Sequence, residues 1–200
     1  MHLFVFYIFI SALFISSIFS TPSPEKKKLA ITTPKAFIDF HKKAIYTRLK
    51  KSIQKADVVF PPHKIRLAVF KKEKKVELWM PNVANQWRFV KEYAFTANSG
   101  ESGPKLYYGD LQIPEGIYGI DSMALSTEYH LALHVNYPND FDKAMLALEG
   151  RDPHYVSTGI NIHGGNISYG CVVVGNTNIE EIFYLTYLAG KNNTELYIFP

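Results

Sequence analysis

A histidine and the single cysteine of the chain lie eight residues apart in the segment 160–175, which reads INIHGGNISYGCVVVG. An alternating apolar pattern ends in His163, and a glycine turn at Tyr169-Gly170 comes directly before Cys171. A cysteine nucleophile needs its thiolate, which a neighbouring imidazole forms by taking the proton or stabilises as an imidazolium. One loop of this length can bring both side chains together. The spacing therefore predicts a cysteine nucleophile activated by His163.

The elements around this loop follow from the spacing of apolar residues. Thr33-Pro34 supplies an N-cap and a first-turn proline, and the fourfold apolar spacing that follows predicts an amphipathic helix over residues 34–55. A capping box at residues 177–180 predicts a second helix that stops at Gly190, and residues 142–148 suit a short one. Strand patterns cover residues 65–70, 76–80, 87–96, 116–120, 129–135, 159–163 and 195–199. The predicted fold class is mainly β or α+β.

The composition is that of one globular domain behind an export segment. The 200 residues are 47% hydrophobic and 20% charged, which excludes a disordered chain. Residues 1–20 are nearly all apolar, which predicts either a cleaved signal peptide or an uncleaved N-terminal anchor, and export in both cases. Residues 21–33 then read as a polar tether, residues 34–60 hold the amphipathic helix, and residues 61–200 form the main domain.

Two interpretations of Cys171 compete. A lone cysteine ahead of three valines is, before its neighbours are considered, more often a small buried apolar residue than a catalyst. An exported protein that keeps one unpaired thiol beside Gly170 carries an oxidation risk that packing does not require, so we favour catalysis. The N–H groups of Gly170 and Cys171 are then candidate donors to an oxyanion. A metal site is not expected, because no second cysteine or suitably spaced histidine accompanies the pair.

Positive charge is concentrated in the first half of the chain. Residues 25–75 carry 16 Lys and Arg against 4 acidic residues, and the rest carries 6 against 14. Such a face can attract anionic lipid, a carboxylate-rich polymer or nucleic acid, and export makes nucleic acid the least expected partner. Solvated lysines with no partner are the open alternative.

The motifs together resemble a known family. His163-Gly164-Gly165 followed by Ser168-Tyr169-Gly170-Cys171 is similar to the active-site signature of the L,D-transpeptidase catalytic domain (YkuD family), and of its YafK-like branch in particular. Residues 66–79, 103–116 and 136–139 resemble a first hairpin, a central loop and a further marker of that branch. The resemblance covers about residues 66–200. It implies an L,D-transpeptidase-like mixed β-sandwich with an N-terminal amphipathic helix and one C-terminal helix.

The resemblance implies cysteine-dependent acyl transfer on peptidoglycan stem peptides, through a thioester acyl-enzyme and without a cofactor or metal. Cys171 matches the nucleophile and His163 the general acid and base. Gly164 falls where a backbone carbonyl orients the imidazole, and Gly170 supports the nucleophile through its backbone. The implied location is the periplasm or cell envelope. An amidase or peptidase of the same fold, which hydrolyses stem peptides or protein–peptidoglycan linkages, is the closest alternative.

Substrate binding is less well defined by the sequence. Ser168 matches the hydroxyl position of the signature, and Tyr169 and Lys105 are weaker candidates, as are Tyr107 and Asp110, whose surroundings suit turns equally well. A wall-linked protein is a further possible partner. A second alternative function is a non-catalytic module that binds the cell wall or a membrane surface through the basic N-terminal half.

Overall fold

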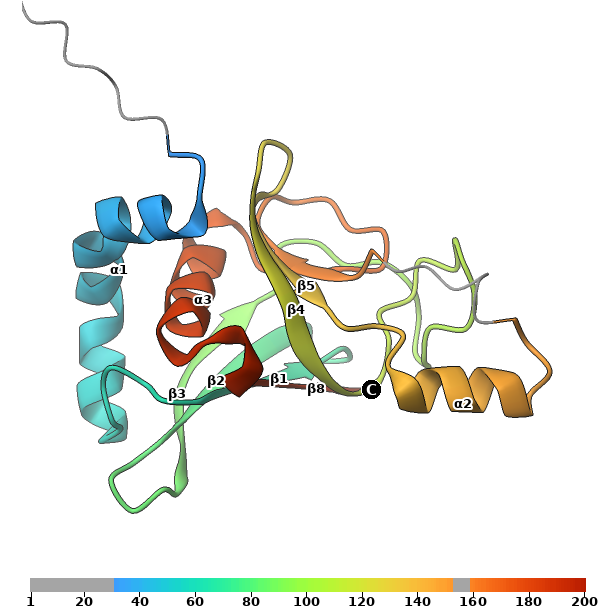
Figure 1. Ribbon diagram of the computed structural model, residues 1–200, viewed down its shortest axis with the longest axis horizontal. Coiled ribbons are helices and arrows are strands. Elements are labelled where there is room, and N and C mark those ends of the chain that lie inside the picture. Colours follow the sequence, from blue (N-terminus) through green and yellow to red (C-terminus); the bar gives the residue numbers. More distant parts are fainter. Residues whose placement is uncertain (1–30, 153–158) are drawn as a thin grey trace, which may run out of the picture. The chain divides into compact units, whose positions relative to one another are not determined.

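The computed structural model of the protein describes residues 31–152 and 159–200 (Figure 1). The predicted export segment, most of the predicted tether, and His154 lie outside the described residues. Within the described part of the chain, none of the helices combines the length and apolar character of a membrane span.

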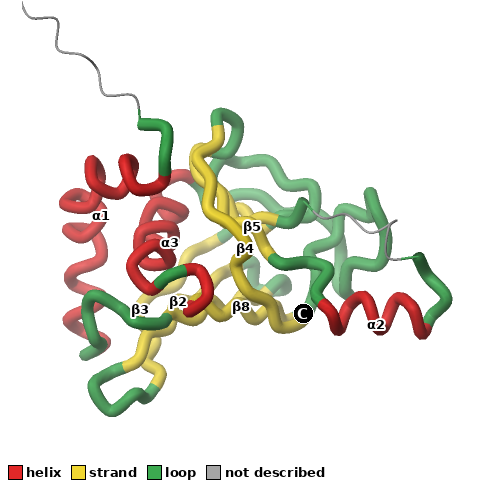
Figure 2. Tube along the Cα trace, in the orientation of Figure 1, coloured by secondary structure: helices red, strands yellow, loops and turns green. Residues whose placement is uncertain are grey.

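One curled sheet of eight strands forms the frame of the fold, and Figure 2 shows the strands in yellow. Its strands are β1 (Ile65–Phe70), β2 (Lys75–Pro81), β3 (Trp87–Ala94), β4 (Gly116–Ser126), β5 (His130–Val135), β6 (Asn161–His163), β7 (Val172–Val173) and β8 (Thr194–Phe199). The order across the sheet is β3-β2-β1-β8-β4-β5-β6-β7. The β1–β8 and β6–β7 pairs are parallel, and the other neighbours are antiparallel.

Strand β4 joins the two halves of the sheet. Its first residues, Gly116 to Gly119, pair with β8, and the residues from Ile120 to Ser126 pair with β5. The register shifts between Ile120 and Ser122, where the strand changes partner. The sequence predicts only the first five residues of this strand, because Asp121 and Ser122 interrupt the apolar pattern there.

The two longer helices lie side by side, and the shortest α-helix lies apart from them (Figure 1). Helix α1 (Pro34–Ala56) and helix α3 (Asn176–Ala189) pack against each other, with the Phe37 and Phe183 ring centroids 6.1 Å apart. Helix α2 (Asp140–Leu148) lies on the opposite side of β4 from α1 and α3. A short 3-10 turn, η2 (Lys191–Asn193), leads into β8. The helices and strands share one buried core, so α1 packs as part of the same fold as the sheet.

The predicted start of α1 is observed. The Thr33 hydroxyl accepts a hydrogen bond from the Ala36 N–H at 3.2 Å, and Pro34 is the first helical residue. The helix ends before Asp57, whose φ of 52° places it in the left-handed region. The fourfold spacing predicts a buried stripe of Phe37, His41, Ile45, Leu49 and Ile53. All of these are buried except His41, which is half-buried, and Ile38 is buried in addition.

The predicted capping box of the C-terminal helix is wrong. Helix α3 begins at Asn176 after Gly175, and no side chain caps its first turn. Glu180 instead accepts a hydrogen bond from Arg48 of α1 at 2.6 Å and lies 3.0 Å from the His130 ring. The helix does stop at Gly190 as predicted. The mixed α+β class is confirmed.

Part of the positive charge of the first half is neutralised inside the fold. The Glu181 side chain is 1% exposed and accepts hydrogen bonds from Arg48 and Lys91 at 3.2 and 2.7 Å. Arg66 and Lys71 also pair with carboxylates, each at 2.7 Å. The exposed basic surface is therefore smaller than the residue count suggests. Contact with a membrane or a polymer stays a prediction, and it would depend on exposed lysines of α1 such as Lys43, Lys50 and Lys51.

Candidate active site

Two short parallel strands place the predicted site residues together. The register of β6 and β7 sets Ile162 beside Val172 and His163 beside Val173, so Cys171 enters β7 next to the strand that carries His163. The Ser168 hydroxyl donates to the Cys171 carbonyl at 2.8 Å and closes the turn between them. The eight-residue loop of the sequence therefore starts and ends on adjacent strands.

The His163 ring is fixed by a backbone carbonyl. His163 is 1% exposed, and its Nδ1 lies 2.6 Å from the Gly164 carbonyl oxygen. A carbonyl oxygen only accepts, so Nδ1 carries the proton and Nε2 is the basic nitrogen of the neutral ring. Burial lowers the pKa of His163, although the Gly164 hydrogen bond and the charge of Glu128 oppose this effect. The imidazole is therefore neutral at neutral pH.

The Cys171 thiol is half-buried, and its Sγ lies 3.6 Å from the Gly159 carbonyl oxygen. Burial raises the pKa of the thiol, while hydrogen bonds from the Asn161 backbone and side chain and the charge of Lys105 lower it to a smaller extent. The thiol consequently holds its proton at neutral pH. Of the two ways in which an imidazole can provide a thiolate, this favours proton transfer during the reaction over a preformed ion pair, because burial outweighs the nearby donors.

The thiol and the imidazole lie on the same face of β6. Asn161, which hydrogen-bonds the sulfur, and His163 are two residues apart, and alternate residues of a strand point to the same side. Tyr129 lies near both the His163 ring and the Cys171 thiol. Its ring centroid is 4.2 Å from that of His163, and burial, Glu128 and negative charge on Cys171 all raise the pKa of its phenol.

The Gly170 N–H is already used, contrary to its predicted role as an oxyanion donor. It donates to the Ser99 hydroxyl at 2.7 Å, and the Ser99 and Ser168 hydroxyl oxygens are 2.8 Å apart. Gly170 has a φ of +101°, and a Cβ there would meet the Gln112 carbonyl oxygen at 2.9 Å. The residue must therefore be glycine for the turn to fit under the central loop.

The weaker candidates for substrate binding, Lys105, Asp110, Tyr107 and Tyr169, differ in their burial and their partners. Lys105 is buried and donates to an Asp110 carboxylate oxygen at 2.5 Å and to the Tyr107 carbonyl at 3.1 Å. Asp110 also accepts from backbone N–H groups of the same loop, so the Lys105–Asp110 pair folds the central loop. The side chains of Tyr107 and Tyr169 are exposed. Lys105 alone of these has a charge that reaches Cys171.

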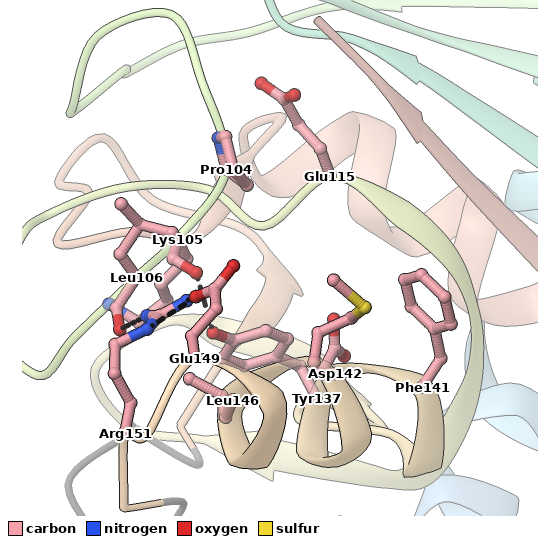
Figure 3. Close-up of a pocket in the computed structure, with 11 residues that line it drawn as sticks. Pro104, Lys105, Leu106, Glu115, Tyr137, Phe141, Asp142, Leu146, Glu149 and Arg151 are labelled. Carbon is pink, nitrogen blue, oxygen red and sulfur yellow. Dashed lines mark hydrogen bonds and ion pairs between the residues drawn. The ribbon is translucent and has the colours of Figure 1, made fainter.

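A cavity of about 310 Å³ lies between the central loop and α2, beside Lys105 (Figure 3). Tyr137 donates its hydroxyl proton to the Lys105 carbonyl, and Arg151 binds both the Leu106 carbonyl and Glu149. The charged groups drawn there are thus largely paired with the loop or with each other, and Phe141, Met145 and Leu146 make much of the wall apolar.

Sequence reasoning missed four polar residues of this site. Tyr129, Asn161 and Ser99 contact the predicted pair or its turn, and Asn176 binds the Gly165 N–H at 2.7 Å. Of these four residues, only Asn161 could have been inferred from the sequence, because it lies two residues before His163 in the predicted strand and so on the same face. Within residues 31–152 and 159–200, no three His, Cys, Asp or Glu side chains gather as metal ligands would.

Comparison with known proteins finds sequence similarity over part of the chain. No family model matches the chain. A protein of Escherichia coli (strain K12) named "Putative L,D-transpeptidase YafK" is 29% identical over 141 residues, which is 68% of this chain and 54% of that protein. The protein of the same name from Escherichia coli O157:H7 gives the same values. The chain is thus similar to YafK over about two thirds of its own length. The resemblance to L,D-transpeptidases inferred from the His163–Cys171 segment is confirmed.

A solved structure supports the fold. The crystal structure of the helical cell shape determining protein Pgp2 from Campylobacter jejuni superposes with a TM-score of 0.54 and 22% identity, over 68% of this chain and 47% of that chain. This likeness concerns the fold. The chain spans about half the length of YafK and of Pgp2.

Proposed function

We propose that this chain is a cysteine-dependent acyl transferase of the cell envelope that acts on peptidoglycan stem peptides. The observation that carries the proposal is the parallel register of β6 and β7, which brings Cys171 beside the strand of His163, with Nδ1 of the His163 ring held by the Gly164 carbonyl. Kinship with YafK supports the choice of substrate.

The reaction starts from two neutral groups. His163 Nε2 takes the thiol proton as Cys171 Sγ attacks the amide carbonyl of an L-centre in the stem peptide. The new C–S bond forms, the C–N bond breaks, and the leaving amine takes the proton from His163. A thioester on Cys171 remains. A second amine, which gives its proton to His163, then attacks the thioester and restores the thiol.

Two neutral groups suit a buried site better than a preformed ion pair. Separated charges in an apolar pocket are costly unless hydrogen bonds compensate them. Donors at Asn161 and the charge of Lys105 favour the thiolate as it forms, so this stabilisation is available when the proton has moved to His163. In this proposal the backbone carbonyl of Gly164 takes the part that a carboxylate plays in a serine triad.

Hydrolysis is the closest alternative, because water in place of the second amine gives an amidase or peptidase. Incubation of the protein with purified sacculi, followed by mass analysis of the released fragments, separates the two. We expect new cross-links whose donor is an L-centre. Loss of linkages without new ones would replace the transferase by the hydrolase.

The acyl-enzyme is tested more directly by intact mass. A stem tetrapeptide should add its acyl part to the wild-type chain and release its terminal amino acid, and Cys171→Ala should show no addition. An equal addition to Cys171→Ala would refute both enzyme proposals. Retained binding of the Cys171→Ala variant to sacculi, with no turnover by the wild type, would favour the non-catalytic binding module.

A further inference from the structure

The peptide group between Gly164 and Gly165 is held at both of its polar ends. Its carbonyl oxygen accepts the His163 Nδ1–H at 2.6 Å, and its N–H donates to Asn176 Oδ1 at 2.7 Å. The C=O and N–H of a trans peptide point in opposite directions within one rigid plane. An acceptor that fixes the N–H therefore also fixes the direction of the carbonyl that meets the His163 ring.

Asn176 is itself firmly placed. It is the first residue of α3, whose next turns bury Ile179, Ile182 and Phe183 completely. The Ile179 N–H bonds the Gly175 carbonyl at 3.0 Å, which fixes the helix start. The Asn176 side chain thus transmits the position of a core helix to the loop after His163.

The loop fits tightly against Asn176. A Cβ on Gly164 would lie 2.6 Å from Asn176 Oδ1 and 2.7 Å from the Tyr129 carbonyl oxygen. The Gly165 carbonyl, on the next peptide group, accepts from the Thr96 hydroxyl at 2.9 Å. The segment is therefore held on two sides by side chains from elsewhere in the fold, and a substituent at Gly164 has no space.

The hydrogen bonds from His163 through the Gly164–Gly165 peptide group to Asn176 form a relay, in which every donor points toward Asn176. Imidazole donates to a carbonyl, and the N–H of the same peptide group donates to the Asn176 oxygen. Hydrogen bonds in such a chain polarise one another, so an acceptor at the N–H makes the carbonyl a better acceptor for Nδ1–H. This arrangement favours the tautomer in which Nε2 has the free lone pair.

We propose that Asn176 is a positioning residue that sets the orientation and tautomer of the His163 ring through the Gly164–Gly165 peptide group. The consequence for turnover rests on the proposed function, whereas the consequence for the ring does not. The conservative variant Asn176→Asp keeps an oxygen acceptor and adds charge to the relay. The near-isosteric variant Asn176→Leu removes the acceptor.

The test is NMR of the full chain with 15N-labelled histidine, with the His163 signals assigned by their loss in His163→Gln. The wild type should show Nδ1–H as the dominant tautomer. In Asn176→Leu the fraction of this tautomer should fall, and in Asn176→Asp it should be kept, with titration of His163 at a higher pH than in the wild type. An unchanged tautomer and titration in Asn176→Leu would overturn the proposal.

Turnover gives a second readout. Asn176→Leu should lower kcat about 10- to 100-fold with little change in KM, because a small misplacement of a catalytic group costs about this much. Asn178→Leu is the matched control: Asn178 lies in the same turn of α3, donates to the Val174 carbonyl and not to the Gly164–Gly165 peptide group, and its loss should leave the His163 tautomer unchanged. A change of equal size in this control would mean that the helix start, not the relay, is responsible.

Two outcomes keep the inference apart from the proposed function. A shifted tautomer in a protein that never turns over stem peptides would refute the transferase and leave the role of Asn176 intact. If Asn176→Leu does not fold, Asn176→Asp decides, because a His163 titration equal to that of the wild type would refute the relay.

Discussion

His163 on β6 and His130 on the adjacent strand β5 are held by different kinds of partner. The His163 ring is buried, donates to the Gly164 carbonyl and packs on Tyr129. The His130 side chain is 33% exposed, and its Nε2 lies 3.0 Å from a carboxylate oxygen of Glu180. The His163 ring is thus held by a backbone carbonyl. The His130 ring contacts Glu180, which lies beside the ion pairs that join α1, α3 and β3.

The difference assigns separate tasks to the two histidines. The carbonyl partner of His163 binds Nδ1 and keeps Nε2 available as a base, whereas Nε2 of His130 is already occupied by the Glu180 carboxylate. Proton transfer requires the neutral ring. The structure therefore favours His163 as the base in the proposed reaction and His130 as part of the helix attachment.

The sharpest test of this comparison is to remove each ring in turn. His163→Ala should lower the turnover of a stem peptide about 100- to 10,000-fold, the usual contribution of a general acid and base. His130→Asn should keep turnover near the wild-type level, and asparagine suits the φ of +66° at this position. Steady-state kinetics with circular dichroism as a folding control measures both. Equal losses in the two variants would remove the distinction.

The second test concerns stability. Glu181→Leu should lower the free energy of unfolding by about 2–3 kcal/mol, because Arg48 and Lys91 lose a buried partner but are partly exposed and can reach water. Urea unfolding measures the loss. Glu180→Gln is the control at a more exposed carboxylate and should cost less. A larger loss for Glu180→Gln would contradict the burial argument.

The third test concerns the pH dependence of turnover and of Cys171 alkylation, which reports on His163 and its proposed partner. Because the pKa of His163 is lowered, the ring stays a base as the pH falls below 6.5, and the acid limb of turnover should lie below that value. Because the pKa of Cys171 is raised, iodoacetamide should alkylate it more slowly at pH 7 than it alkylates a free cysteine. Alkylation faster than that of free cysteine would restore the preformed thiolate inferred from the sequence alone.

The sequence predicts most of the elements and the core of the site, because both depend on neighbours along the chain. The stripe of α1, its Thr33 cap and the loop between His163 and Cys171 are local patterns with local causes. The observed strands differ from the predicted ones chiefly at β4, whose later residues take β5 as a partner where the apolar alternation stops.

The failures have long-range causes. The predicted capping box of α3 competes with Arg48, which lies 132 residues earlier and binds Glu180. The predicted donor role of the Gly170 N–H competes with Ser99, which lies 71 residues earlier. Arg48 and Ser99 are polar and come from distant segments, so the spacing of residues near the site carries no sign of them. The burial that raises the pKa of Cys171 is likewise not visible in any local pattern.

The smallest expected effect concerns Ser99, which connects the turn before Cys171 to the central loop. Its hydroxyl oxygen accepts from the Gly170 N–H at 2.7 Å and lies 2.9 Å from the Leu111 carbonyl. Ser99→Ala should cost about 1 kcal/mol in the free energy of unfolding, the net value of a typical hydrogen bond. If the freed Gly170 N–H then serves the oxyanion, kcat should rise or stay level while stability falls. A fall in kcat as large as that of His163→Ala would place Ser99 in the reaction itself and would require the Gly170 N–H to be held in order to act.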